Sequence, residues 1–222
     1  MKIAAVADVH SPKYIKEFEI ALSQVDVPDV FLFAGDMVNF GMTSQYSNVI
    51  QAIDTVFATR VPIIACFGNE EFEEFRPDIR NHVRDRIVFL DGESTTIESF
   101  ESKSGVIGVT APAEQEGQFT SEGLREIYEE HARRLNRLMR KTAVDIDFLI
   151  ILMHYSPLAE GPHVKDEIRY SWWFLNAIAD LEPDLVIHGH LHGGDKLEVA
   201  IGKTRILNVA FPASRKVTEV IL

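Results

Sequence analysis

The sequence predicts an α/β fold: a largely parallel β-sheet covered by helices, with a second, mixed sheet beside it. Short apolar runs alternate with stretches of helical periodicity over the first 68 residues, and apolar runs return at 147–154 and 184–194. Continuous apolar runs suit strands buried on both faces, as they are in parallel sheets. Between residues 86 and 110, three short strands with close turns follow one another, which indicates a mixed or second sheet.

The first part of the chain supplies strands and helices in alternation. We expect strands at 2–8, 29–36 and 61–68, and helices at 12–25 and 43–60. The first helix has amphipathic spacing, with apolar residues at Tyr14, Phe18, Ala21, Leu22 and Val25. Strands that alternate with helices in this way favour a parallel arrangement of the three strands.

The later part adds a long helix, a second helix and a closing hairpin. The long helix is expected at 120–142, with an apolar face made by Leu124, Ile127, Tyr128, Leu135, Leu138 and Met139. The second helix is expected to run through Ile168, Trp172, Leu175 and Ile178. A hairpin turns near Gly202, and a strand at 215–222 closes the chain. Because no repeat or linker interrupts these elements, we expect a single domain over residues 1–222.

Composition narrows the class of protein. With 222 residues and 46% hydrophobic content, the chain can bury a core without help from disulfides. The single cysteine, Cys66, lies in an apolar run and is interpreted as a core residue of a cytoplasmic protein. No apolar window is long enough for a membrane span, so no membrane partner is expected. The formal net charge of −12 disfavours binding to extended nucleic acid.

Polar side chains gather where the predicted strands end. Five apolar strands are followed by Asp8, His10, Asp36, Asn69, His154, His190 and His192. Taken singly, the aspartates could start turns and the histidines could be satisfied core residues. Ligands of open α/β sheets, however, collect at the carboxyl ends of the strands, where these side chains would meet. The sequence therefore predicts a metal site at this edge.

The donor types indicate which metals would bind. The set has no cysteine, so a structural zinc site with thiolate ligands is excluded. Imidazole, carboxylate and amide donors suit manganese, which we expect first, as well as iron, zinc, nickel and cobalt. Seven ligands exceed the needs of one catalytic ion. They suit two divalent ions about 3.5–4 Å apart, an arrangement used in phosphoester hydrolysis.

The order of these residues resembles that of the calcineurin-like metallophosphoesterases. The matching blocks are Asp8-x-His10, Gly35-Asp36-x-x-Asn39, Gly68-Asn69, His154 and Gly189-His190-x-His192. The chain is similar to the small, Icc-related members. The resemblance implies a four-layer αββα sandwich with two facing mixed sheets, which agrees with the two classes of strand. It also implies hydrolysis of a phosphoester by in-line attack of a hydroxide that bridges two metal ions.

The resemblance also assigns the ligands. One metal ion would be held by Asp8, His10, Asp36 and His192. The other would be held by Asp36, Asn69, His154 and His190, so that Asp36 bridges the two. Asp36, Asn69 and His154 are thus expected to take part in catalysis. Asn39 could orient the loop or a ligand, and His188 is interpreted as a residue that packs in the core or supports a ligand from behind.

Glu70 departs from the family pattern, which has a histidine after the asparagine. That histidine is commonly assigned to protonating the leaving group or to stabilising the transition state. Glu70 could act as the acid if its pKa is raised, or it could be a surface residue or a hydrogen-bond acceptor. His163 and Lys165, in the loop after His154, are alternative candidates for the general acid, at the border of the site. Because a missing acid matters least for good leaving groups, we expect a phosphodiester or activated phosphoester as substrate.

The sequence is also compatible with other functions. The expected partner is a small phosphoester such as a nucleotide. The alternative functions are a nuclease acting on DNA and a binding scaffold that has lost catalysis. Trp172 is placed on the apolar face of its helix. Trp173 and Phe174 lie elsewhere on that helix, where they could stack on a nucleobase or form a homodimer contact.

Overall fold

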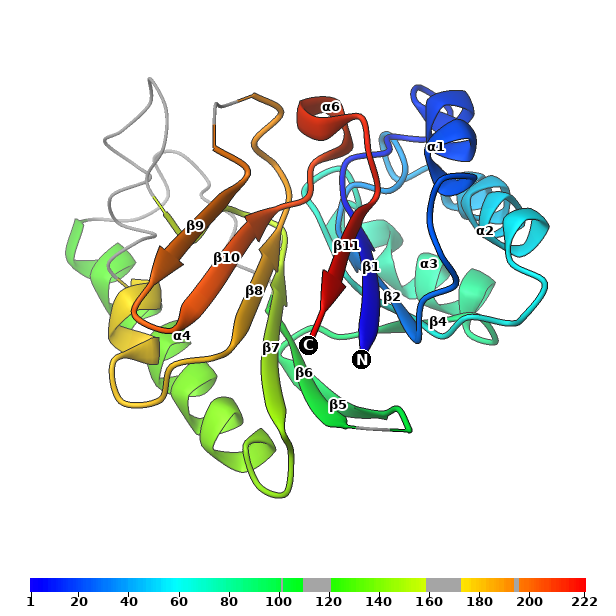
Figure 1. Cartoon of the computed structure of the whole chain (residues 1–222). Helices are drawn as coiled ribbons and strands as arrows, with labels where there is room; N and C mark the ends of the chain where they lie inside the picture. Colours follow the sequence, from blue (N-terminus) through cyan, green and yellow to red (C-terminus); the bar gives the residue numbers. More distant parts are fainter. Residues whose placement is uncertain (101, 110–120, 159–172, 194–195) are drawn as a thin grey trace.

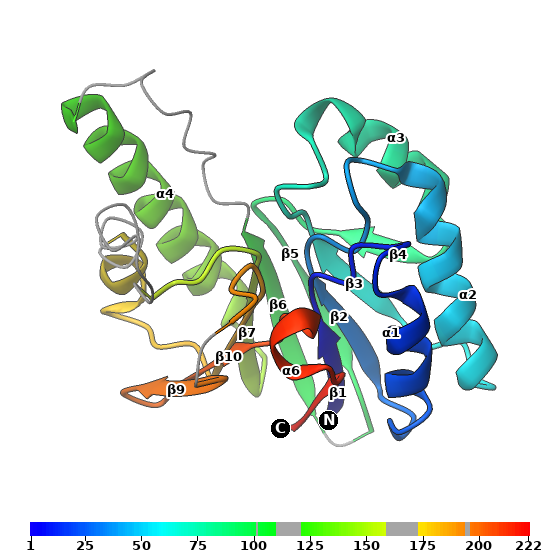
Figure 2. The ribbon, with the colours of Figure 1, turned by 90° about the horizontal axis from the view of Figure 1, so that it is seen from above.

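Two β-sheets pack face to face, and helices cover the outer face of each (Figures 1 and 2). The structure is a computed structural model. It describes the chain except for residues 101, 110–120, 159–172 and 194–195, and it leaves the side chains of 121–125, 127 and 128 undescribed. The four layers are those of an αββα sandwich, so the predicted fold is confirmed.

The first sheet contains the strands predicted at the start of the chain. Its order is β11-β1-β2-β3-β4, and its strands are β1 (Lys2–Val6), β2 (Val30–Ala34), β3 (Ile63–Cys66), β4 (Ile87–Phe89) and β11 (Thr218–Ile221). β1 to β4 are parallel and β11 is antiparallel to β1. Its outer face is covered by α1 (Ile15–Leu22), α2 (Tyr46–Val56) and α3 (Arg76–Val83). Short 3-10 turns, η1 (Thr43–Gln45) and η2 (Glu73–Phe75), precede α2 and α3.

The second sheet is also mixed. Its order is β5-β6-β7-β8-β10-β9, with β5 (Glu93–Glu98), β6 (Lys103–Val109), β7 (Phe148–Met153), β8 (Leu185–His188), β9 (Glu198–Ile201) and β10 (Thr204–Asn208). The four inner strands are parallel, and the edge strands β5 and β9 are antiparallel to their neighbours. The outer face is covered by α4 (Ser121–Thr142) and by helical residues 173–178. A one-turn helix, α6 (Phe211–Ser214), precedes β11.

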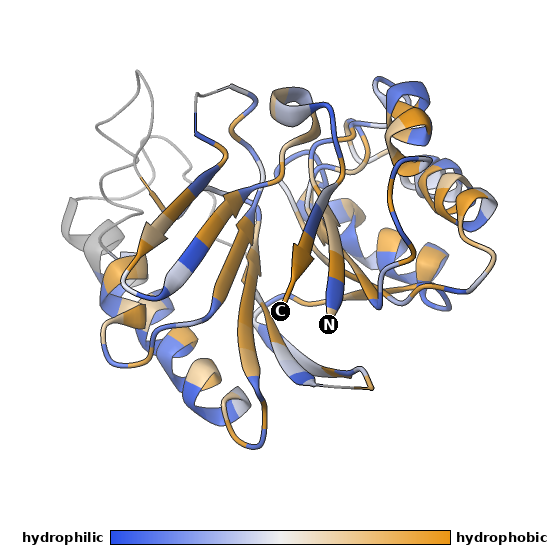
Figure 3. Cartoon of the chain, viewed as in Figure 1, coloured by the Kyte–Doolittle hydropathy of each residue, from blue (hydrophilic) through white to orange (hydrophobic). Residues whose placement is uncertain are grey.

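Alternation along the strands divides the apolar side chains among three cores. Ala4 and Val6 of β1 face α1 to α3, whereas Ile3 and Ala5 face the second sheet. Cys66 belongs to the core between the sheets, as predicted. A third core lies between the second sheet and α4. Strands buried on both sides explain the continuous apolar runs that Figure 3 shows in orange.

Some details of the sequence interpretation were wrong. Trp173 and Phe174 are buried in the third core, whereas Leu175 is exposed, so the inward face of this helix is rotated from the predicted one. Neither aromatic ring is therefore available to a base or to a second subunit. β4 belongs to the first sheet rather than the second. Trp172, His163 and Lys165 lie outside the described residues.

Among the residues that the structure describes, no helix is both long and apolar enough to cross a bilayer.

Candidate metal centre

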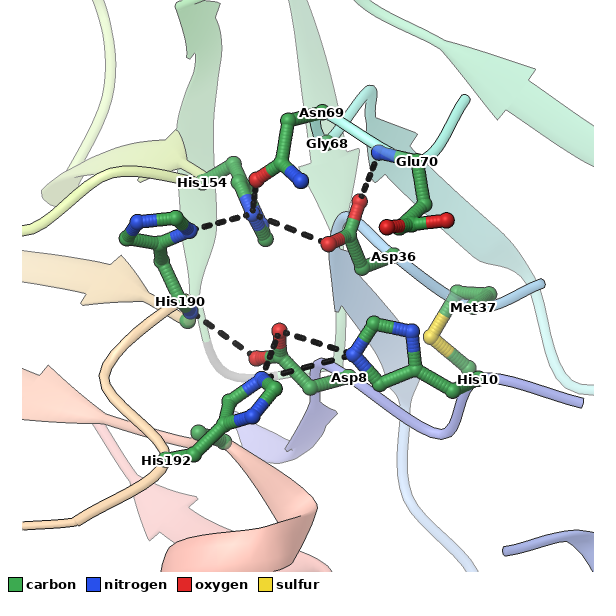
Figure 4. Close-up of polar contacts among 12 residues, drawn as sticks. Asp8, His10, Asp36, Met37, Gly68, Asn69, Glu70, His154, His190 and His192 are labelled. Carbon is green, nitrogen blue, oxygen red and sulfur yellow. Dashed lines mark hydrogen bonds and ion pairs between the residues drawn. The ribbon is translucent and has the colours of Figure 1, made fainter. Parts of the chain in front are cut away.

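The carboxyl ends of β1, β2 and β3 in one sheet meet those of β7 and β8 in the other (Figure 4). The backbone joins the two sheets here. Ala7 donates to the carbonyl of Val209, and the N–H of His190 donates to Asp8 Oδ2 at 2.9 Å. All seven ligand candidates thus line one edge of the sandwich, because parallel strands deliver their ends to the same side.

Asp8, His10 and His192 form the first group of donors. The Nε2 atom of His192 lies 2.9 Å from Asp8 Oδ1, and the Nε2 atoms of His10 and His192 lie 3.3 Å apart. His10 Nε2 is 3.7 Å from the same Asp8 oxygen. Asp8 and His10 are buried, whereas the His192 side chain is 44% exposed. One donor atom from each residue can therefore reach a single ion.

His154 is the centre of the second group. Its Nε2 atom lies 3.0 Å from Asn69 Oδ1, 3.2 Å from His190 Nδ1 and 3.4 Å from Asp36 Oδ2. Its Nδ1 atom donates a hydrogen bond to the Ala34 carbonyl at 2.8 Å, which turns Nε2 toward the site. Asp8 also lies within reach of the Asp36–His154 pair, so the two groups adjoin.

Four of the ligand candidates have a left-handed backbone conformation, which sets the direction of their side chains. Asp8, His10, Asp36 and His190 all have positive φ values, of 59°, 47°, 52° and 67°. Left-handed backbone costs a residue with a side chain about 1 kcal/mol or more, and such positions cluster at functional sites. Four strained residues among seven ligand candidates are the signature of a site selected for its geometry.

Two motif glycines are required by close contacts. A Cβ atom at Gly68 would lie 2.1 Å from Asp36 Oδ1, and one at Gly189 would lie 2.5 Å from Asp8 Oδ2. Any larger residue would push the neighbouring carboxylate out of place. The glycines before Asn69 and His190 are thus part of the site.

A family model for calcineurin-like phosphoesterases matches residues 1–194. The chain belongs to the calcineurin-like phosphoesterase family. The match spans all seven ligand candidates. No curated protein matches the chain significantly.

Solved structures share the fold of this family member at low sequence identity. GAP50, described as the anchor in the inner membrane complex of Plasmodium, has a TM-score of 0.64 and 12% identity over 97% of this chain and 72% of its own. TT1561 of Thermus thermophilus has a TM-score of 0.62 and 14% identity, over 99% and 97% of the two chains. A putative 5'-nucleotidase from Staphylococcus aureus has a TM-score of 0.61 and 15% identity. This chain is covered over 99% of its length and spans 50% of that protein.

Glu71 is a site residue that the sequence interpretation of this phosphoesterase missed. Its side chain is fully buried and accepts five hydrogen bonds. Oε2 accepts from the backbone N–H groups of Asp36 and Gly68, both at 2.7 Å. Oε1 accepts from Met37, Val38 and the Tyr46 hydroxyl. Glu71 therefore ties the loop that carries Asp36 to the loop that carries Asn69.

Glu70 behaves differently from its neighbour. Its backbone N–H donates to Asp36 Oδ1 at 2.7 Å, and its carboxylate accepts from the Phe40 N–H at 2.9 Å. Figure 4 shows the Glu70 side chain beside Asp36, on the opposite side of that carboxylate from His154. In this position Glu70 acts as a hydrogen-bond acceptor for the loop after β2.

Charges within the site shift several pKa values. Burial lowers the pKa of His154, but the Asp36 carboxylate raises it, with a net increase to about 9. Burial raises the pKa of Asp36, but His154, the Glu70 N–H and His10 together more than offset this, so that the pKa lies below its ordinary value. Burial and the neighbouring His154 lower the pKa of His190 to about 4. Without metal, a proton is thus shared mainly between His154 and Asp36, and His190 is neutral.

Glu71 and His188 titrate under the influence of burial. Burial and the charge of Asp36 raise the pKa of Glu71 to about 7, against the hydrogen bonds from Gly68 and Asp36. Burial lowers the pKa of His188 to about 4. The Nδ1 atom of His188 lies 2.9 Å from the Gly189 carbonyl, and its ring is buried beside Leu191 and Asn208 rather than among the ligands. His188 therefore occupies a packing position.

Asn39 contributes through its backbone. Its N–H donates to the Ser11 carbonyl at 3.1 Å, and its own carbonyl accepts from Met42 at 2.9 Å. These bonds shape the loop after β2, which is one of the two roles expected for Asn39.

Proposed function

We propose that the chain is a phosphohydrolase that uses two divalent metal ions to hydrolyse a phosphodiester or an activated phosphoester. The observation that supports it is the arrangement of seven donors in two adjoining groups at one sheet edge. The family supplies the reaction class, and the number of ions and the substrate preference belong to the proposal.

The residues present fit such ions. Imidazole nitrogens and carboxylate or amide oxygens converge within each group, so that one atom from each residue can reach a common point. Divalent ions bound there would lower the pKa of a bound water and stabilise negative charge on phosphate oxygens. Asp8, His10, Asp36 and His192 would hold one ion, and Asp36, Asn69, His154 and His190 the other. Imidazole with oxygen donors suits manganese, iron, zinc, nickel or cobalt.

Side chains of the site also determine its charge. Only Asp8 and Asp36 among the seven ligand candidates carry negative charge, and Asn69 adds an oxygen without adding charge. Two doubly charged ions would therefore leave a positive centre within a chain of net charge −12. A small anionic substrate would be attracted locally, whereas a long polyanion would be repelled by the rest of the surface.

The preference for good leaving groups follows from Glu70. Its carboxylate is engaged by the Phe40 N–H, in a position where an acceptor rather than a proton donor is needed. The leaving oxygen would then depart with little help from an acid. This matters least for substrates whose leaving group is a weak base, such as the phenolate of an aryl ester.

Hydrolysis of two chromogenic esters tests the proposal. With Mn²⁺ bound, we expect faster turnover of bis-p-nitrophenyl phosphate than of p-nitrophenyl phosphate, with the metal content measured on the same sample. Activity on neither ester at full metal occupancy would refute the enzymatic function. Such a result would favour a metal-binding scaffold.

A further inference from the structure

Four large apolar side chains are exposed on the loops beside Asn69 and Glu70. They are Phe40, Met42, Phe72 and Phe75, with exposed fractions of 63%, 44%, 38% and 38%. The centres of the Phe72 and Phe75 rings are 6.3 Å apart. The Phe75 ring packs on Gly41, which lies between Phe40 and Met42 in the sequence. These four residues are called the aromatic rim below. Exposed aromatic residues gathered at a polar site indicate a recognition surface.

Glu70 connects the aromatic rim to the metal centre. Its backbone N–H donates to Asp36 Oδ1, and its carboxylate accepts from the Phe40 N–H. Its carbonyl accepts from the Gly41 N–H at 2.7 Å. Glu70 thus contacts both the ligand candidate Asp36 and the backbone of Phe40. A substrate bound at the centre would lie next to the rim.

Phe40 is held in an unfavourable conformation. Its φ is 48° and that of Gly41 is 63°, so two consecutive residues are left-handed. This conformation is a rare outlier for a bulky residue, and an aromatic ring that is 63% exposed gains little from burial in return. Stability of the free protein does not explain why a phenylalanine stands here. A role in contacting a ligand does.

We propose that Phe40, together with the other residues of the aromatic rim, contacts an aromatic group carried by the alcohol that is esterified to the phosphate at the metal centre, with the Phe40 ring stacked on it. The group is a nucleobase or an aryl ring, and the inference rests on the function proposed above. Acidic residues Glu70, Glu73 and Glu74 lie on the same loops, and each copy of the chain carries a net charge of −12. A second copy or an acidic chain would therefore be repelled, whereas a neutral ring would not.

The test compares two ligands that differ by one base. Binding of adenosine 5'-monophosphate and of ribose 5-phosphate to the Mn²⁺-loaded protein is measured by calorimetry, with released phosphate assayed in parallel. Stacking on one aromatic ring increases affinity by roughly 5-fold or more. We expect the adenosine ligand to bind more tightly by about this factor. We also expect Phe40→Ala to remove most of the difference while leaving ribose 5-phosphate unaffected.

Matched variants separate the ring from its backbone. Phe100→Ala removes a fully exposed ring from the turn between β5 and β6, away from the site, and should change neither affinity. Phe40→Trp should keep the preference for the adenosine ligand. In hydrolysis of bis-p-nitrophenyl phosphate, Phe40→Ala should raise KM by a similar factor and change kcat little.

Failure of the inference can be told apart from failure of the proposed function. Equal affinity for the two ligands, or a Phe40→Ala variant that keeps the difference, overturns the role of the rim even if the protein hydrolyses phosphoesters. A dimer in sedimentation that Phe40→Ala separates would overturn it as well, because the rim would then bind a second copy. Absence of hydrolysis with metal bound refutes only the proposed function.

Discussion

Replacing Glu71 with glutamine tests whether one buried carboxylate holds the metal centre together. The change keeps the shape of the side chain and exchanges one oxygen for an NH₂ group. Oε1 now accepts from Met37, Val38 and Tyr46, and Oε2 accepts from Asp36 and Gly68. The NH₂ group must therefore face backbone N–H donors whichever way the amide is turned.

The cost can be worked out from these contacts. In one orientation the amide leaves Asp36 and Gly68 without an acceptor. In the other it leaves Met37 and Val38 without one, since the Tyr46 hydroxyl can turn to accept. Each buried donor left unpaired costs about 1–3 kcal/mol, so we expect a loss of about 2–6 kcal/mol in the free energy of unfolding at a pH above about 7, where Glu71 is ionised. For a chain of this size, the melting temperature would fall by roughly 5–20 °C.

Thermal and urea unfolding of the metal-free protein measure this loss, and calorimetry with Mn²⁺ measures the effect on the site. Glu70→Gln is a matched control in the adjacent position. Its single side-chain bond, from the Phe40 N–H, can be kept by the amide oxygen, so its stability should change by less than about 0.5 kcal/mol. Similar stability of the two variants would refute the assignment of Glu71 as the anchor of the two loops.

Three further predictions concern the metal and the strained loop. Asp36→Asn should lose bound metal and hydrolysis together, whereas loss of hydrolysis at unchanged metal content would contradict a ligand role. Since the pKa of His154 is raised to about 9, an ion must displace its proton below that pH. Mn²⁺ affinity should therefore fall as the pH is lowered from 9 to 7, by up to about tenfold per unit, in a competition assay with a chelating dye. A pH-independent affinity would be inconsistent with this competition. Phe40→Gly should relieve the left-handed strain and raise the melting temperature by about 2–4 °C, whereas a lower value would show that the ring contributes more by packing.

How much the sequence predicts depends on whether a residue acts through its place in the chain or through its surroundings. Asp8, Asp36 and Asn69 could be placed together because the carboxyl ends of neighbouring parallel strands lie at one edge of a sheet, whereas His154 follows β7 of the second sheet and comes close to them through the packing of the two sheets. Glu71 could not be placed in this way, because its role depends on donors from two loops that enclose it after folding. A second glutamate directly after Gly68-Asn69-Glu70 is the one sequence signal that could have suggested it.

Helix faces show the same limit. Spacing in the sequence predicts an inward face through Leu175 for the helix that holds Trp173 and Phe174, but apolar residues occur all around this helix. Periodicity does not identify the buried face of a helix when several faces are apolar. Here the buried face is set by packing against α4 and the second sheet. The exposure of Phe40 likewise follows from the left-handed backbone of its loop, which no pattern in the sequence indicates for a phenylalanine.

Anomalous diffraction at the manganese edge, from crystals of the Mn²⁺-loaded protein, tests the central claim most directly. Two peaks are expected at the sheet edge. One peak should be coordinated by Asp8, His10 and His192, and the other by Asn69, His154 and His190, with a carboxylate between them. A single peak, or two peaks that lack these ligands, would contradict a two-metal centre built by the ends of both sheets.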